Sequence, residues 1–237
     1  MLPFLDPLHP VFPHPETALT DPDGLLAVGG NLHTDTLVDA YRNGIFPWYE
    51  EGQPILWWSP ASRAVLVPGA EHTGRTMAKV LARGTFQITT DCAFEHVVTA
   101  CAGSRRGASG TWITAAMIDA YGRLHRDGVA HSLECWQNGE LVGGLYGLQI
   151  GALFCGESMF SRVANASKVA FIVLSRTLAR HGFALIDCQI PNPHLTSLGV
   201  TTLPRCEFLH QLHRYRDERR AWPDNDDFAE NLTVVVS

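Results

Sequence analysis

The chain lacks an excess of positive charge, and this limits the partners that its whole surface can bind. Its 237 residues contain 18 Lys and Arg against 24 Asp and Glu, which gives a net charge of −6. Neutralising nucleic-acid phosphates needs a clear excess of Lys and Arg. A general affinity for nucleic acid is therefore excluded, and any contact with nucleic acid has to be local.

Long apolar runs are missing as well. No segment approaches the ~20 consecutive apolar residues that cross a membrane. The first residues, MLPFLDPLHP, lack the basic start and apolar stretch of a signal peptide. The composition, 46% hydrophobic and 18% charged, is that of a globular protein with one large or two modest domains. We therefore expect a cytoplasmic protein with no membrane partner.

The spacings typical of metal sites and disulfide frameworks are also absent. The six cysteines, at positions 92, 101, 135, 155, 188 and 206, form no CxxC pair, and the eleven histidines are scattered. Most of the cysteines fall within apolar segments, which favours reduced, buried thiols. The sequence thus predicts no metal site and no disulfide.

Proline is concentrated at the N-terminal end. Ten of the fourteen prolines and three of the six tryptophans lie in residues 1–68, where a short helix over 36–44 leads into the aromatic segment IFPWY. The composition changes between Ser59 and Arg63. This change predicts a small Pro/Trp-rich N-terminal domain over 1–62 and a larger domain over 63–237, whose acidic segment 222–231 is expected to be mobile.

The larger domain alternates helical and strand patterns. Asn138-Gly139 between two apolar runs is the strongest hairpin signal, and a helix closed by Gly182 leads directly into the strand 183–190. Hairpin, helix and strand in this order predict a mixed sheet crossed by a helix, with ligands at the strand ends. The expected helices are 76–84, 93–103, 113–128 and 165–182, and the expected strands are 85–91, 130–137, 140–151, 152–160 and 183–190.

Polar residues close the last buried strand. In LIDCQ, strand alternation places Asp187 and Gln189 on one face and Cys188 on the other. Residues two apart on one face are roughly 7 Å apart, so a carboxylate and an amide can reach one small ligand from two sides. The alternative is a structural role for both residues at the strand end.

Two other chemistries compete for this stretch. A Cys188 nucleophile served by His194 is disfavoured, because two prolines separate them and the thiol lies on the opposite face from Asp187. An acetyl-coenzyme A transferase needs a glycine-rich cradle before the 165–182 helix, yet SRVANAS contains no glycine. We infer that the chain has the scaffold of such an enzyme without its cofactor. The chemistry that this scaffold then favours is acyl transfer from another activated donor.

Several uncommon segments occur together in the chain. They are DGLLAVGGNL, GIFPWY, PILWWSP, GTWIT, AHSLECW, LVGGLYG, FCGESMFS, NASK and LIDCQ, between about Phe12 and Leu212. Jointly they resemble the leucyl/phenylalanyl-tRNA protein transferase family, which adds Leu or Phe to proteins that begin with Arg or Lys. The resemblance implies an α/β (α+β) fold in which an acetyltransferase-like (GNAT-like) mixed sheet with helices carries out aminoacyl transfer, beside the small N-terminal domain.

The resemblance also implies roles for single residues. Asp187 and Gln189 are the expected catalytic pair: Gln189 orients the amine through its carbonyl, and Asp187 holds the amide of Gln189 or takes the proton through a water. Glu157 is expected to contact the cationic acceptor. The donor side chain is expected to enter an apolar pocket formed by Leu145, Met159, Phe171 and Ile186. The 3′ adenosine of the tRNA is expected to contact Tyr41, Trp48 and Trp112. The tRNA backbone is expected to contact Arg75, Lys79 and Arg83.

The sequence therefore predicts an aminoacyltransferase that uses aminoacyl-tRNA (Leu-tRNA or Phe-tRNA, with Met as a further possible donor) and a protein or peptide with N-terminal Arg or Lys. No metal and no organic cofactor are implied, and the product would be marked for degradation by the N-end rule. Two alternatives stay open at this point. One is an acetyl-coenzyme A-dependent N-acetyltransferase, and the other is a tRNA-binding protein that has lost catalysis.

Overall fold

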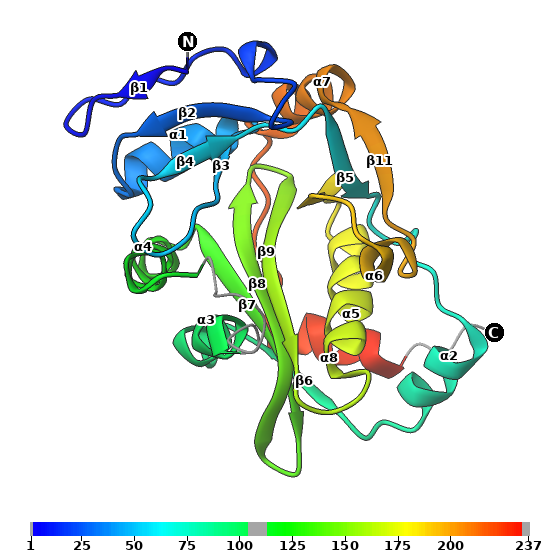
Figure 1. Ribbon diagram of the computed structural model, residues 1–237. Coiled ribbons are helices and arrows are strands. Elements are labelled where there is room, and N and C mark those ends of the chain that lie inside the picture. Colours follow the sequence, from blue (N-terminus) through cyan, green and yellow to red (C-terminus); the bar gives the residue numbers. More distant parts are fainter. Residues whose placement is uncertain (1, 104–112, 234–237) are drawn as a thin grey trace.

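The computed structural model describes residues 2–103 and 113–233. They form a mixed α/β structure with two β-sheets (Figure 1). The smaller sheet has four strands and comes from the N-terminal part of the chain. In spatial order its strands are β1 (Phe4–Leu5), β2 (Leu25–Gly29), β4 (Leu56–Trp58) and β3 (Phe46–Pro47).

The larger sheet is built from the chain after residue 61. It has seven strands, and β10 is parallel to β9 whereas the other neighbouring strands are antiparallel. This is the mixed sheet that the sequence predicts. Its strands are, in spatial order, β11 (Thr201–Pro204), β5 (Ser62–Leu66), β10 (Leu185–Gln189), β9 (Leu153–Ser161), β8 (Glu140–Ile150), β7 (Ala130–Gln137) and β6 (Gln87–Thr90).

Helices cover both faces of the larger sheet (Figure 1). On one face lie α3 (Phe94–Gly103) and α4 (Ala115–Arg126), and on the other lie α5 (Ala166–Arg180) and α8 (Asn225–Thr233). Side chains alternate between the two faces of each strand, and they contribute to two separate apolar cores between the sheet and its helices. The remaining helices are η1 (Pro15–Thr17), α1 (Thr34–Arg42), α2 (Arg75–Ala82), α6 (Pro193–Thr196) and α7 (Arg205–Tyr215).

The expected hairpin and helices are confirmed. Asn138 and Gly139 join β7 to β8 with φ of 53° and 78°, the left-handed pair that a two-residue hairpin turn requires. In α4 the side chain of Thr114 accepts a hydrogen bond from the backbone N–H of Met117 (3.2 Å), and Gly128 follows the helix with φ of 72°.

The N-terminal part shares its core with the larger sheet. Leu37 and Tyr41 of α1 pack in the same buried cluster as Leu148 of β8 and Phe208 of α7. The two sheets separate in the sequence between β4 and β5, close to the expected boundary at residue 62. The division into domains 1–62 and 63–237 stays a prediction, since one apolar core crosses it.

The acidic C-terminal segment is packed, which contradicts the expectation that it is mobile. The ring of Trp222 stacks on His131 with centroids 4.1 Å apart, and its Nε1–H donates to Thr90 Oγ1 (2.9 Å). Phe228 of α8 is fully buried. The acidic residues occupy the exposed side of a short amphipathic helix, and two aromatic rings among them are enough to hold the segment against the sheet.

Replacing Phe228 tests this packing. Phe228→Ala removes a fully buried aromatic ring and should lower the free energy of unfolding by roughly 3 to 5 kcal/mol. Asp226→Ala, on the exposed side of the same helix, should change it by less than about 0.5 kcal/mol. Urea unfolding followed by tryptophan fluorescence measures both. Equal, small losses for the two variants would show that α8 does not pack stably on the sheet.

Candidate functional site

The strands β9 and β10 pair over only part of their length, and a cavity lies where they diverge. Parallel pairing ends where Asp187 lies opposite Cys155. Beyond that point β9 continues to Ser161, whereas β10 ends at Gln189. All six residues from 156 to 161 line a cavity of about 550 Å3. The diverging strands thus make an opening in the sheet between its two helical layers.

The apolar end of the cavity contains the residues expected for the donor side chain. Leu145 of β8 and Met159 of β9 are cross-strand partners, while Phe171 projects from α5 and Ile186 from β10. All four line the cavity, together with Phe154, Leu174 and Leu195. The structure therefore brings the predicted set together, and its contact with a donor side chain stays a prediction.

The polar end contains Gln189 and Glu157. The side-chain Nε2 of Gln189 donates a hydrogen bond to Glu157 Oε1 (2.6 Å). Two tyrosine hydroxyls also donate to this carboxylate, Tyr41 to Oε1 (2.7 Å) and Tyr121 to Oε2 (2.8 Å). Glu157 is the acidic side chain among the described residues that line the cavity. These hydrogen-bond partners are all neutral, so within the described part of the chain this buried carboxylate has no cation bonded to it.

The backbone at Gln189 departs from strand geometry. Gln189 has φ of 63°, and the pairing of β10 with β5 shifts by one residue between Asp187 and Gln189. The alternation predicted for LIDCQ is therefore wrong at its end, because a bulge interrupts it. Cys188 and Gln189 both line the cavity, whereas Asp187 does not.

Asp187 is occupied by a buried ion pair. Its Oδ1 accepts from Arg63 Nε (2.8 Å) and its Oδ2 from Arg63 Nη2 (2.7 Å), and both side chains are at most 2% exposed. Asp187 Oδ1 also accepts from the backbone N–H of Gln189 (2.9 Å). The expectation that Asp187 holds the side-chain amide of Gln189 is thus wrong: it holds the backbone amide, and Glu157 holds the side chain.

Arg63 connects four parts of the molecule. Its guanidinium lies between the rings of Phe46 (4.7 Å to the centroid) and Phe208 (4.6 Å), and Nη1 donates to the carbonyl of Gly44 (3.2 Å). Burial lowers its pKa, but the neighbouring Asp187 carboxylate raises it, and the net shift is upward. Arg63 is therefore a permanent cation that locks Asp187 in place.

Burial controls the ionisation of Glu157. It raises the pKa of this carboxyl to about 7; the hydrogen bonds from Tyr41, Tyr121 and Gln189 oppose the rise, and the charge of Asp187 adds to it. Burial and the charge of Glu157 also raise the pKa of Tyr41 and of Tyr121, so both hydroxyls stay protonated. Glu157 can thus change its protonation state near neutral pH.

The thiol in the cavity is poorly suited to nucleophilic chemistry. Burial raises the pKa of Cys188, and the charge of Asp187 adds to the rise. Burial and the charge of Lys168 lower the pKa of His194, which lines the same cavity. No hydrogen bond joins Cys188 to His194 among the described contacts. Both observations agree with the predicted inert thiol.

The aromatic residues expected at the tRNA end differ in exposure. Trp48 is 41% exposed, lines the cavity and packs on Trp58 with centroids 5.7 Å apart. Tyr41 is 1% exposed and does not line the cavity, and its hydroxyl donates to Glu157 Oε1. Its contact with the 3′ adenosine stays a prediction. Trp112 lies outside the described residues.

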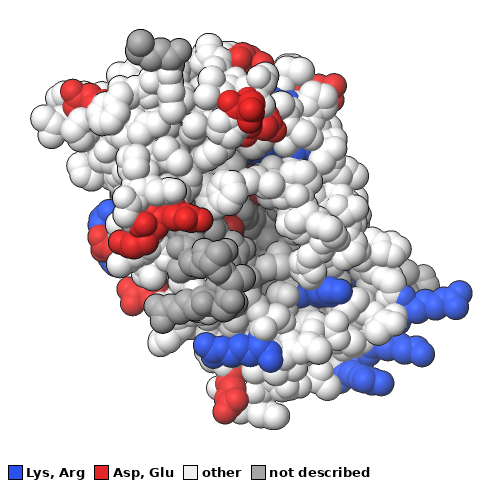
Figure 2. All heavy atoms as spheres, in the orientation of Figure 1, with Lys and Arg blue, Asp and Glu red and all other residues white. Residues whose placement is uncertain are grey.

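The basic stripe is on the surface of α2. Arg75, Lys79 and Arg83 are exposed, and Lys and Arg side chains gather at the lower right of Figure 2, where α2 lies. None of the three lines the cavity. Their contact with the tRNA backbone stays a prediction.

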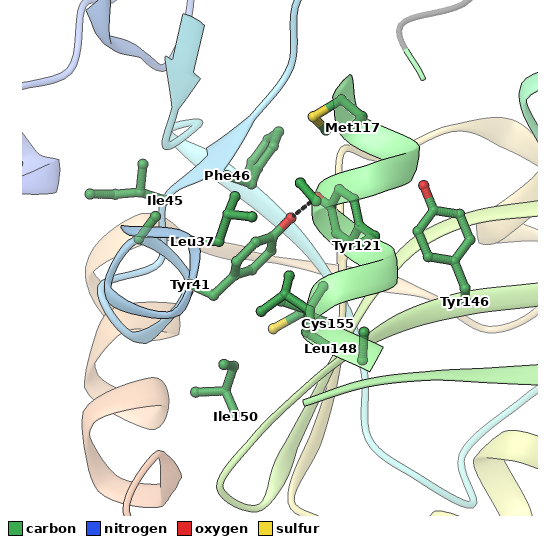
Figure 3. Close-up of a cluster of buried hydrophobic side chains, with 14 of the residues drawn as sticks. Leu37, Tyr41, Ile45, Phe46, Met117, Tyr121, Tyr146, Leu148, Ile150 and Cys155 are labelled. Atoms are coloured by element: carbon green, nitrogen blue, oxygen red, sulfur yellow. Dashed lines mark hydrogen bonds between the residues drawn. The ribbon is translucent and has the colours of Figure 1, made fainter. Parts of the chain in front are cut away.

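Two residues of the site were missed by sequence reasoning. Arg63 was read only as part of a boundary, although an arginine that opens an apolar strand was a signal that it has a buried partner. Tyr121 falls in the helix expected over 113–128, where apolar spacing predicts no more than a core residue. Its hydroxyl reaches Glu157 and lies 2.6 Å from the hydroxyl of Tyr41 (Figure 3).

Other kinds of site find no support in the described ranges. No group of three or more His, Cys, Asp or Glu side chains there could hold a metal ion. Cys92 and Cys206 are exposed instead of buried. The helices of residues 2–103 and 113–233 include none with the length and apolarity to cross a membrane.

The chain matches two family models. Residues 65–213 match the model described as leucyl/phenylalanyl-tRNA protein transferase, and residues 30–61 match the model of the N-terminal domain of the same family. A protein with this name from Stutzerimonas stutzeri is 55% identical over 89% of this chain and 93% of its own length. One from Azotobacter vinelandii is 57% identical over 87% of this chain and 91% of its own.

Solved structures show only weak similarity. L-PGS from Bacillus licheniformis has a TM-score of 0.40 at 11% identity and covers 71% of this chain and 54% of its own. A GCN5-related N-acetyltransferase-like protein from Streptococcus suis has a TM-score of 0.32 at 13% identity and covers 72% of this chain and 64% of its own. Likeness at this level carries no argument about this chain.

The buried ion pair predicts a strong effect of Asp187→Asn on stability. The variant leaves Arg63 as an uncompensated buried cation, and the free energy of unfolding should fall by roughly 3 to 5 kcal/mol. Asp217→Asn is the matched control, since its ion pair with Arg42 is exposed to solvent and should change the free energy of unfolding little. Chemical unfolding at pH 7.5 compares the two. A loss below 1 kcal/mol for Asp187→Asn would contradict the structural role of the pair.

The carboxyl of Glu157 predicts a pH dependence of stability. Its pKa rises from 4.5 to about 7 on folding, so the native state holds the proton more tightly than the unfolded state. Its contribution to the free energy of unfolding is complete below pH 4.5 and is lost as the pH rises through 7. Between pH 5 and pH 8, the free energy of unfolding of wild type should therefore fall by roughly 2 to 3 kcal/mol relative to that of Glu157→Gln. Glu50→Gln, at an exposed site, should follow wild type. Chemical unfolding at a series of pH values measures this. If the free energy of unfolding changes with pH in the same way in all three proteins, the pKa of Glu157 is not raised.

Proposed function

The chain belongs to the leucyl/phenylalanyl-tRNA protein transferase family and is an aminoacyltransferase, and from this membership we propose that it transfers Leu or Phe from aminoacyl-tRNA to proteins that begin with Arg or Lys. Met is a further donor. The modified proteins would be marked for degradation by the N-end rule. The observation that carries the proposal is the cavity in which four apolar side chains and the polar pair Gln189 and Glu157 meet.

The shape of the cavity matches an aminoacyl ester. The apolar end, formed by Leu145, Met159, Phe171 and Ile186, receives the side chain of the donor amino acid. The pliable thioether of Met159 allows both an aliphatic and an aromatic side chain to pack there. A β-branched side chain such as Val or Ile is wide at Cβ and stiff at χ1, and it should enter poorly. The ester then lies where the strands diverge, beside Gln189.

The chemistry needs mainly positioning. The donor ester is already activated, and an α-amino group with a pKa near 8 is partly neutral at physiological pH. The Nε2 of Gln189 is engaged by Glu157, so its carbonyl Oε1 is turned to accept a hydrogen bond from the incoming amine. Asp187 acts indirectly: its carboxylate accepts a hydrogen bond from the backbone N–H of Gln189 and so fixes the backbone there.

The acceptor is attracted by negative charge at the polar end. Glu157 provides that charge when it is ionised, and it is the carboxylate that the described part of the cavity offers to an acceptor with N-terminal Arg or Lys. Its hydrogen bonds to two tyrosines keep the carboxylate pointing into this end of the cavity. An acceptor without a basic first residue lacks this attraction.

The tRNA is held at the cavity mouth and on α2. Trp48 is exposed beside the cavity and offers a ring for the terminal adenosine, with Trp112 as a second candidate. Arg75, Lys79 and Arg83 give α2 a basic face for the phosphate backbone, and this contact should weaken as salt rises.

We also assign the seven-stranded sheet to the acetyltransferase-like (GNAT-like) type. The support is its mixed topology and the divergence of the parallel pair β9 and β10 beside the start of α5, where such a sheet receives its acyl donor. No glycine-rich turn precedes α5, in agreement with a donor other than coenzyme A. No metal and no organic cofactor take part in the proposed reaction.

The test is the transfer of labelled leucine and phenylalanine from charged tRNA to two peptides, one beginning with Arg and one with Ala. Wild type should label the Arg peptide alone. Gln189→Ala should lower the rate roughly 100-fold, because it removes the group that orients the amine. Gln137→Ala, the same substitution at the far end of β7, should leave the rate unchanged.

Two outcomes would contradict the proposal. If wild-type protein binds charged tRNA and labels neither peptide, the chain is a binding protein on the same scaffold. If the Arg and Ala peptides are labelled equally, the transfer is real, but the acceptor preference and the role of Glu157 in it are wrong.

A further inference from the structure

Two tyrosine hydroxyls and both carboxylate oxygens of Glu157 close a ring of three contacts at the polar end of the cavity. The hydroxyls of Tyr41 and Tyr121 are 2.6 Å apart, and either can be the donor. Each also contacts Glu157, at 2.7 Å to Oε1 and 2.8 Å to Oε2. Figure 3 shows the two tyrosines, from α1 and α4, pointing toward each other. All three contacts are as short as hydrogen bonds between oxygens.

The number of protons in this ring depends on Glu157. Each tyrosine hydroxyl supplies one proton, so with Glu157 ionised two protons serve three contacts. One pair of oxygens then faces each other without a hydrogen between them. Protonation of Glu157 supplies the third proton, and every contact can become a hydrogen bond that runs the same way around the ring. The ring is therefore complete when it holds one extra proton.

The ring communicates with the cavity through Glu157. Tyr41 and Tyr121 are at most 1% exposed, whereas Glu157 lines the cavity and is joined there to Gln189. A proton can reach or leave the ring from the reaction site. Within residues 2–103 and 113–233, the titratable and charged groups that act on Glu157 are Tyr41, Tyr121, Cys155, Asp187 and, through Asp187, Arg63, while Tyr146 acts on Tyr121.

The second carboxylate of the site cannot perform this task. Both oxygens of Asp187 accept from Arg63, one also accepts from the backbone of Gln189, and the side chain does not line the cavity. A proton leaving the amine therefore meets Glu157 and not Asp187.

We propose that Glu157 takes the proton of the attacking amine and passes it to the leaving ribose oxygen, with Tyr41 and Tyr121 as positioning residues. The inference rests on the aminoacyl transfer proposed above. The lone pair of the amine forms the C–N bond while the ester carbonyl becomes an oxyanion, and the proton released by nitrogen completes the ring. The carbonyl re-forms, the C–O bond to the ribose breaks, and the leaving oxygen takes the proton from Glu157. Atoms and charge balance, and Glu157 ends as it began.

The ionisation of Glu157 is compatible with this cycle. Burial raises its pKa to about 7, within about a unit of an ordinary α-amino group. A proton acceptor with a pKa near the working pH is partly ionised and still holds a proton well, which is the condition for efficient general base catalysis.

The test is the ratio of kcat/KM for wild type to that for Glu157→Gln between pH 5.5 and 8.5, with Phe-tRNA and an Arg-initiated peptide. Ionisations of the two substrates cancel in the ratio. The ratio should rise about tenfold per pH unit below 7 and level off above it, at roughly 10² to 10⁴. A contact that only binds the acceptor as a cation would change kcat/KM through KM and leave kcat equal in the two proteins, so the ratio of kcat at saturating peptide is measured as well and should rise with pH in the same way.

A second variant tests the ring itself. Tyr121→Phe removes a donor that favours the ionised form of Glu157, so the midpoint of the kcat/KM profile should move up by about one pH unit. Tyr49→Phe, which removes a buried hydroxyl outside the ring, should leave the midpoint in place. Circular dichroism confirms that each variant is folded before its rates are compared.

The outcomes separate the two proposals. A ratio that does not change with pH, or a Tyr121→Phe profile that loses rate without moving its midpoint, would overturn the proton-accepting ring while leaving the transfer activity established. Absence of any transfer by wild-type protein would overturn both.

Discussion

The buried ion pair between Arg63 and Asp187 is the interaction on which the geometry of the site depends. The guanidinium lies between Phe46 and Phe208, so it ties the N-terminal sheet and α7 to the centre of the larger sheet. The carboxylate in turn holds the backbone of Gln189 in a left-handed conformation that a glutamine rarely adopts. The position of Gln189 is thus set by Arg63, a cation that does not line the cavity.

Two carboxylates lie near each other in very different surroundings. Asp187 faces a fixed cation in the interior, while the hydrogen bonds of Glu157 to described residues come from neutral donors at the cavity. The first is therefore a rigid support and the second a group that can exchange a proton, although the two residue types are chemically alike. The opening between β9 and β10 makes this division possible, because both strands line the cavity there while the side chain of Asp187 stays outside it, against Arg63.

Sequence patterns were sufficient wherever the structure is locally periodic. The hairpin at Asn138 and Gly139 and the helix that buries Tyr121 follow from turn chemistry and apolar spacing. The bulge before Gln189 could not be predicted, because alternation assumes an unbroken ladder and the shift is fixed by β5, more than 120 residues earlier in the chain. The role of Tyr121 was hidden for the same reason, since its hydroxyl partners come from α1 and β9. The sequence led to residues that line one cavity, but not to the contacts among them.

The core that joins the N-terminal part to the larger sheet has a consequence for the order of events during synthesis. The apolar face of α1 and the residue Gly44 are covered by α4, by β8 and by α7, which begins at Arg205. Translation at 5 to 20 residues per second separates these segments by roughly 10 to 30 s. During that interval β1 to β4 can pair with one another, but the apolar face of α1 lacks its packing partners. The N-terminal part therefore completes its core only after α7 has been synthesised.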